Sequence, residues 1–190
     1  MDTLQEKQLI FLVEDNPIFA EVVKTGIENE LDLTVLHFST GEEMLDYLIK
    51  NPLVRPEIFI LDFELNSKVE SAKNGKQILQ ELVQRYKQKK IIEELKVIML
   101  TGSGEIELAI DLLKLGATDY ISKFKENDNN YEFFEKLKKT IRNILNMKAL
   151  KAEKMHYQQK SETYLKRLIY ISIALTLVII TLGLVYFKTK

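Results

Sequence analysis

Between residues 8 and 123 the chain alternates five times between short apolar runs and longer stretches with helical spacing of apolar residues. The short runs read as strands at residues 8–14, 33–39, 57–62, 96–101 and 119–123. The first, third and fourth runs are apolar at nearly every position, which is typical of parallel strands covered on both faces. The alternation predicts an α/β fold, a doubly wound five-stranded parallel sheet with right-handed crossovers.

Residues with strong capping preferences mark the ends of the helices between these runs. Asn, Ser and Thr are favoured just before a helix, proline is tolerated in its first turn, and glycine favours the left-handed conformation that ends many helices. The start signals are Asn16 with Pro17, Thr40 with Glu43 as a capping box, Asn74 with Gly75, and Ser103; the stop signal is Gly116. We therefore expect one helix in each gap between strands.

The chain has no glycine or proline from Tyr131 to Leu182, so one long helix can occupy this region. In its first part Phe134, Leu137, Ile141 and Ile144 form a stripe with helical spacing, which we expect to pack on the sheet. The same heptad continues through polar residues, which make a poor coiled-coil seam. We therefore expect residues 149–167 to form a solvated, partly helical basic stalk, with a dimeric coiled coil as the alternative.

Residues 168–187 are twenty consecutive residues without a charge. A helix rises about 1.5 Å per residue, so this segment reaches roughly 30 Å, the thickness of the hydrocarbon core of a bilayer. Aromatic residues lie near both of its ends and basic residues flank it, as at membrane interfaces. The segment predicts a single C-terminal transmembrane helix, and the alternative is a buried core helix.

The distribution of basic residues predicts which side of the membrane holds the folded domain. Five basic residues lie between 151 and 167, against Lys188 and Lys190 after the span, so the positive-inside rule places the domain in the cytoplasm. The first apolar run, LIFLV, is shorter than the roughly 7 to 15 residues of a signal-peptide core. With only three residues after Phe187, we expect insertion to follow synthesis of the domain, leaving a single-pass protein of the cytoplasmic (inner) membrane.

Charge is divided unevenly along the chain, although the formal net charge is only −1. Residues 1–150 carry a net charge of −6, whereas residues 151–190 carry +5. An acidic body argues against nucleic acid as the main partner, because nucleic-acid binding requires a basic surface on the folded domain. Cysteine is absent, which excludes disulfides and thiolate metal sites and is compatible with a reducing cytoplasm.

Polar residues with chemical potential fall at the carboxyl ends of the predicted strands, where open parallel sheets bind their ligands. They are Glu14 and Asp15 after the first strand, Asp62 at the end of the third, Thr101 at the end of the fourth and Lys123 at the end of the fifth. Converging carboxylates repel one another, and a hard cation such as Mg²⁺ relieves the repulsion. A carboxylate beside Mg²⁺ and a lysine can act as a nucleophile toward phosphorus and form an aspartyl phosphate.

Over residues 7–148 the sequence resembles the response regulator receiver domain of two-component signalling. Four segments carry the resemblance in the order found in the family: FLVEDNP, PEIFILDFEL, VIMLTGSGE and GATDYISK. The family fold is flavodoxin-like with strand order 2-1-3-4-5, which agrees with the alternation of strands and helices. Together with the patterns described above, the resemblance divides the chain into a receiver domain at 7–148, the stalk at 149–167 and the transmembrane helix at 168–187.

The resemblance also implies a role for each strand-end residue. Asp62 is the expected phosphoacceptor. The expected ligands of Mg²⁺ are Glu14, Asp15, Asp62 and the main-chain carbonyl of Glu64. Thr101 and Lys123 are expected to contact the phosphoryl group, and Tyr120 is expected to be the aromatic residue that rotates in the switch.

Three departures from the family pattern lie close to this site. The loop after Asp62 is about five residues longer than usual and carries Leu65 and Asn66 in place of a Met-Pro pair. Phe124 follows Lys123 where the family has a proline. Glu14 replaces an aspartate, a common variant that keeps the charge. None of these changes removes a required chemical group.

The leading hypothesis is a membrane-anchored receiver that is not an enzyme beyond weak self-catalysed phosphoryl transfer. Its partners would be a histidine kinase or phosphotransfer protein and an output protein that could lie in the same membrane. The main alternative is an unphosphorylated pseudo-receiver that acts as a membrane-bound scaffold. An aspartate-dependent phosphatase is disfavoured because Glu64 stands where that class needs a second aspartate. Labelling by acetyl phosphate separates the first two hypotheses.

Overall fold

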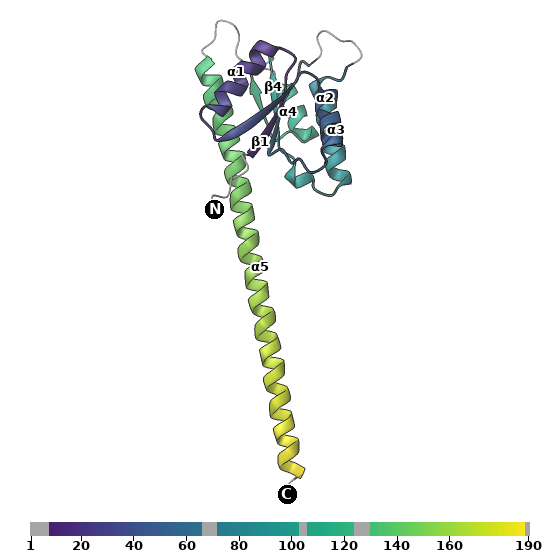
Figure 1. Cartoon of the computed structure of the whole chain (residues 1–190), viewed down its shortest axis with the longest axis vertical. Helices are drawn as coiled ribbons and strands as arrows, with labels where there is room; N and C mark the ends of the chain where they lie inside the picture. The colour runs from purple at the N-terminus through teal and green to yellow at the C-terminus, as the bar shows by residue number, and fades with distance from the viewer. Residues whose placement is uncertain (1–7, 66–71, 103–105, 124–129, 189–190) are drawn as a thin grey trace. The chain divides into compact units, whose positions relative to one another are not determined.

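The five predicted strands form one parallel sheet with the order β2-β1-β3-β4-β5. This computed structural model describes residues 8–65, 72–102, 106–123 and 130–188 (Figure 1). The strands are β1 (Gln8–Val13), β2 (Leu33–Phe38), β3 (Ile58–Asp62), β4 (Val97–Thr101) and β5 (Asp119–Ser122). The predicted fold class and strand order are therefore confirmed.

A helix joins each strand to the next, as the alternation of patterns predicts. These helices are α1 (Pro17–Glu28), α2 (Gly41–Lys50), α3 (Gly75–Gln88) and α4 (Ile106–Leu115), with a short 3₁₀ helix, η1 (Ile92–Glu94), before β4. The last helix, α5 (Asn130–Lys188), follows β5. Helix α1 and the first turns of α5 cover one face of the sheet, and α2, α3 and α4 cover the other (Figure 1).

The predicted capping residues precede α1, α2 and α3, and the capping at α2 differs in part from the prediction. The side chain of Asn16 accepts hydrogen bonds from two backbone N–H groups of α1, and Asn74 and Gln77 form a full capping box at α3. Thr40 caps α2, but the Glu43 carboxylate accepts from the N–H of Ser39, so the predicted box at α2 is only half formed. The Ser103 signal lies outside the described residues.

Alternate side chains of β1 are buried on opposite faces of the sheet. Phe11 and Val13 belong to the core cluster shared with α2, α3 and α4, whereas Ile10 and Leu12 have the opposite parity along the strand. All four side chains are fully buried. This explains the uninterrupted apolar run in the sequence, since neither face of β1 meets water.

The buried stripe of α5 differs from the predicted one at its first position. Phe133 is 5% exposed and packs against the ring of Phe19 in α1 with the ring centroids 5.8 Å apart. Phe134, the predicted residue, is only half-buried, and its ring lies over Gly26, where an added Cβ would approach to 2.7 Å. Both rings therefore contact α1, and the position facing the core is one residue earlier than predicted.

The helix α5 is 59 residues long, so residues 149–167 are helical throughout, whereas the sequence predicts only partial helicity. The chain divides into two compact units, Met1–Ile144 and Leu145–Lys190. Among the described helices α5 alone is long and apolar enough to cross a membrane; its most apolar window has a mean hydropathy of 1.7 and no buried residue. The alternative of a buried core helix therefore finds no support in the packing.

Candidate phosphoacceptor site

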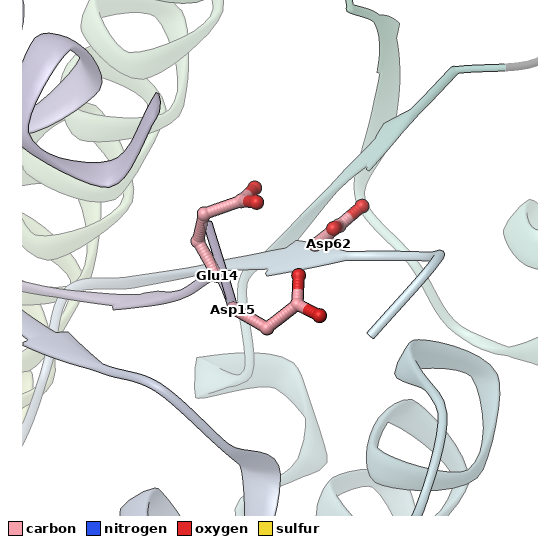
Figure 2. A group of neighbouring side chains, drawn as sticks. All are labelled: Glu14, Asp15 and Asp62. Carbon is pink, nitrogen blue, oxygen red and sulfur yellow. The ribbon is translucent and has the colours of Figure 1, made fainter. Parts of the chain in front are cut away.

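Three carboxylates gather where β1 and β3 end (Figure 2). Glu14 and Asp15 directly follow β1, and Asp62 is the last residue of the adjacent strand β3. One oxygen from each carboxylate lies within 4.8 Å of the others, and Glu14 and Asp62 are almost completely buried. The parallel pairing of β1 and β3 thus brings together residues that are nearly fifty positions apart in the sequence.

Lys123 supplies the positive charge in this cluster. Its Nζ lies 2.8 Å from Glu14 Oε2 and 2.8 Å from Asp62 Oδ2, so one ammonium bridges two buried carboxylates. The same nitrogen lies over the ring of Phe19, 4.7 Å from the ring centroid. An ammonium held by two carboxylates and an aromatic face is well compensated for its loss of water.

The pKa values of Glu14 and Lys123 both differ from their ordinary values. Burial first, and then the neighbouring charge of Asp62, raises the pKa of Glu14 to about 7, although Lys123 and the N–H of Asn16 act to lower it. Burial by itself would lower the pKa of Lys123, but the charges and hydrogen bonds of Asp62 and Glu14 outweigh it and raise that pKa above its ordinary value. Lys123 therefore remains an ammonium, and Glu14 is the group that titrates near neutrality.

Backbone groups hold the carboxylates in place. The N–H of Asn16 donates to Glu14 Oε1 at 3.2 Å, and the N–H of Glu64 donates to Asp62 Oδ1 at 3.1 Å. Nε2 of His37, on β2, donates to the carbonyl oxygen of Glu14 at 2.8 Å. These bonds hold the turns after β1 and β3 and the carboxylates of Glu14 and Asp62 in one arrangement.

The two remaining predicted residues flank the cluster on β4 and β5. Thr101 ends β4, is 1% exposed, and accepts a hydrogen bond from the N–H of Lys123 at its carbonyl oxygen, 2.7 Å away. Tyr120 is half-buried against the core, and the ammonium of Lys136 in α5 lies 5.4 Å from its ring centroid. Thr101 therefore lies next to the strand end that carries Asp62, whereas Tyr120 adjoins α5.

The structure thus gathers Glu14, Asp15, Asp62 and Lys123 into one site. Glu64 adjoins it through its backbone N–H, while its carboxylate lies near Gly102. Phe124 and residues 66–71 of the long loop lie outside the described residues. The contributions of Phe19 and His37 are not evident from the sequence, because no local pattern shows which helix or strand lies beside a given strand end.

Comparison with known proteins agrees with this geometry. The sequence profile of the response regulator receiver domain matches residues 10–133, and the chain belongs to this family. Its members are receiver domains of two-component signalling, which act as phosphoacceptors and typically bind Mg²⁺ at an acidic pocket. No curated protein matches the chain.

Solved structures of response regulators share the fold. The phosphorylated cyanobacterial phytochrome response regulator RcpA is 24% identical, with a TM-score of 0.59 over 74% of this chain and 96% of its own. The response regulator domain of Thermotoga maritima CheB is 21% identical, with a TM-score of 0.57 over 74% and 97%. A response regulator in its Mn²⁺-bound form is 23% identical, with a TM-score of 0.55 over 69% and 89%.

Proposed function

We propose that the chain is a membrane-anchored receiver that accepts a phosphoryl group on Asp62 and signals through partner binding. The observation that carries this proposal is the buried carboxylate of Asp62, grouped with Glu14 and Asp15 and paired with Lys123 Nζ at 2.8 Å. A buried carboxylate with a cation beside it has both the nucleophilic oxygen and the positive charge that phosphoryl transfer needs.

In the proposed reaction an Oδ atom of Asp62 attacks the phosphorus of a phosphorylated histidine. An O–P bond forms as the P–N bond breaks, and the imidazole leaves with the electron pair of the broken bond and takes up a proton. Lys123 stays charged and pairs with the incoming phosphoryl oxygens. Its contacts with both Glu14 and Asp62 keep it within reach of the new acyl phosphate.

The donor set fits a hard divalent cation. Three carboxylates against one ammonium leave a surplus of negative charge, and all the side-chain donors are oxygens, as Mg²⁺ requires. We propose Glu14, Asp15, Asp62 and the carbonyl of Glu64 as the ligands. When bound, Mg²⁺ neutralises the carboxylates and the phosphoryl oxygens that approach them. A response regulator of the same fold has been solved in a Mn²⁺-bound form, which agrees with binding of a divalent cation.

The same site would drive the conformational switch. We propose that the Thr101 hydroxyl donates to a phosphoryl oxygen and that Tyr120 moves into the space that Thr101 vacates. Phosphorylation can shift a pre-existing equilibrium only by the difference in contact energy between the two states, and this hydrogen bond is that difference. Helix α4 and strand β5 would then form the readout face.

The apolar part of α5 would hold the receiver at the cytoplasmic membrane. The exposure of every described residue from 168 to 181 supports this, since burial in the hydrocarbon core of a bilayer stabilises an apolar helix of this length. The phosphoryl donor would be a histidine kinase or phosphotransfer protein. Confinement to the membrane raises the effective concentration of an output partner that shares it.

Labelling with acetyl phosphate tests the proposal. The full chain should gain one phosphoryl group that requires Mg²⁺ and disappears in Asp62→Asn, because the amide is no nucleophile toward phosphorus. Asp46→Asn, at an exposed position of α2, is the matched control and should label normally. Mass analysis that places the phosphoryl group elsewhere would refute the assignment, and a folded chain that never labels would favour the scaffold hypothesis.

A further inference from the structure

A cavity lies between α2 and α3, at the end of the strands opposite to Asp62. Its volume is about 280 Å³, and its lining includes Val54 and Arg55, which precede β3, and Ile91, which lies between α3 and β4. Asp62 ends β3, so the full length of that strand separates the cavity from the carboxylate cluster. The cavity therefore takes no part in the chemistry proposed above.

One part of the cavity wall is apolar. Leu48 and Pro52 come from the end of α2 and the turn after it, and the fully buried Leu82 and the ring of Tyr86 come from α3. The ring of Tyr86 also packs edge-on against Phe59 in the core, with the centroids 6.2 Å apart. A wall anchored in this way to the sheet is set before any ligand arrives.

The wall is closed by an unusual end to α3. Lys90 has a φ of 59°, in the left-handed region, and the N–H of Ile91 donates to the carbonyl of Tyr86 at 3.0 Å. These bonds form a Schellman-type ending, which turns the chain back along the helix. The turn places Ile91 among the lining residues, so the shape of the cavity rests on backbone hydrogen bonds.

The other part of the lining is cationic: Arg55, Arg85 and Lys89. Arg85 is paired with Glu81, at 2.9 Å from Nη2 to Oε1, so its charge is largely compensated. Within the described residues Arg55 donates only to the carbonyls of Pro52 and Val54, and Lys89 has no ion pair. Among the lining residues that the structure describes, none is acidic.

We propose that this cavity binds a small carboxylate with an apolar body, of the size and kind of benzoate. The apolar wall and the tyrosine ring match the body, and the two uncompensated cations at Arg55 and Lys89 match the charge. A planar guanidinium suits a carboxylate because it can donate two parallel hydrogen bonds. The volume of about 280 Å³ lies at the lower end of the roughly 300 to 1,000 Å³ of sites for drug-sized molecules, so it suits a small ligand.

The test uses the full chain in lipid discs of zwitterionic lipid, with benzoate as the probe and empty discs subtracted. Ligand-observed NMR titration should show saturable binding of benzoate. Benzamide, which lacks the charge, and acetate, which lacks the apolar body, should each bind at least about fivefold more weakly. If benzamide bound as tightly as benzoate, the cations would not contribute to binding. If acetate bound as tightly as benzoate, the apolar wall would not contribute. Either result would contradict the proposal.

Variants locate the site. Arg55→Gln and Lys89→Gln should each weaken benzoate binding about two- to fivefold, the usual range for one exposed ion pair, and the double variant should weaken it further. Lys87→Gln, at an exposed position of α3 outside the lining, is the matched control and should bind as the parent does. Phosphoryl labelling at Asp62 should be unchanged in all three single variants and serves as the check of folding. Unchanged affinity in the double variant would overturn the proposal.

Discussion

At the scale of single residues, the acid–base behaviour of the site follows from having one ammonium beside several carboxylates. Glu14 and Asp62 share one ammonium, and burial together with the charge of Asp62 raises the pKa of Glu14 to about 7. The raised pKa of Glu14 means that the folded, metal-free domain binds a proton more tightly than the unfolded chain does. Stability from this group is therefore present at low pH and is lost as the pH rises from the unfolded value of 4.5 toward about 7.

The first prediction is that Mg²⁺ affinity rises with pH across neutrality. A cation displaces the proton of Glu14, whose pKa is about 7, so calorimetric titrations should show tighter binding at about pH 8 than at about pH 6, with proton release at the lower pH. Glu14→Gln should flatten this dependence and weaken binding at the higher pH. A parent protein whose affinity is independent of pH would show that Glu14 does not titrate in this range.

A second residue-scale prediction concerns the left-handed lysine that ends α3. Lys90→Gly should raise the free energy of unfolding by about 0.5 to 1 kcal/mol, because it removes roughly 1 to 2 kcal/mol of left-handed strain and returns part of that as unfolded-state entropy. Lys89→Gly, at a right-handed position, should lower it by about 0.5 to 1 kcal/mol. Denaturant unfolding of the chain truncated after Met147 measures both, and the same sign for both variants would contradict the assignment.

At the scale of elements, glycine at the start of α3 ties that helix to the phosphoacceptor. A Cβ at Gly75 would collide with the carbonyl oxygen of Asp62 and the Cα of Phe63. The N–H of Gly75 also donates to the carbonyl of Phe63 at 3.2 Å. The helix thus begins directly against the strand end that carries Asp62.

The third prediction is that Gly75→Ala slows labelling beyond any effect on stability. Overpacking against backbone should cost about 1 to 3 kcal/mol and shift the Asp62 carbonyl. Gly26→Ala is the matched control, because it overpacks against the Phe134 ring, away from the site. It should lower the unfolding midpoint while leaving the labelling rate of the folded protein unchanged. Equal rates in the two variants would separate Gly75 from the site.

The fourth prediction tests the coupling from β4 to β5. Thr101→Ala should leave Asp62 able to accept phosphate, because the hydroxyl is not the nucleophile. It should reduce the change in amide exchange that phosphorylation produces over residues 106–123. Ser122→Ala, at an exposed position of β5, should preserve that change. Equal exchange changes in the parent and Thr101→Ala would show that the hydroxyl does not carry the coupling.

Strands, caps and the residues at strand ends were predictable because their signals are local. The run before Glu14 and the Asn74 cap can each be recognised within a few residues. Contacts made by distant residues were not predictable. Lys138 of α5, which is 4% exposed and pairs with Glu30 and Glu135, looks in the sequence like a solvent-facing lysine. The contact between the ring of Phe19 and the ammonium of Lys123 was not predictable either, because only the packed structure brings α1 to the end of β5.

At the scale of the whole molecule, the candidate phosphoacceptor site and the long apolar segment belong to different compact units of the chain. The carboxylate cluster and both flanking strands lie within Met1–Ile144, and the uncharged segment lies within Leu145–Lys190. Within the described part of the second unit, residues 149–181 are exposed. The phosphoacceptor should therefore work without the segment that we assign to the membrane.

The fifth prediction is that truncation after Met147 gives a soluble, folded domain that is labelled at Asp62 at about the rate of the full chain. The full chain should fractionate with membranes and resist extraction by salt or alkali, because a spanning apolar helix is held by the hydrophobic effect and not by charge. Recovery of the full chain in the soluble fraction would contradict the anchor. Failure of the truncated domain to fold would show that the apolar helix belongs to its core.

The pairing of β1 with β3 determines when the domain can fold. Ile10 pairs with Ile58, 48 residues further along, so neither the sheet nor its core can form until β3 has left the ribosome. Loop closure over such distances precedes any gain from pairing and makes folding slow. During that interval the edge of β1 that pairs with β3 in the folded domain is unpaired and open to other nascent chains. A strand whose last four residues are buried in the finished domain is therefore a segment that chaperones need to protect during synthesis.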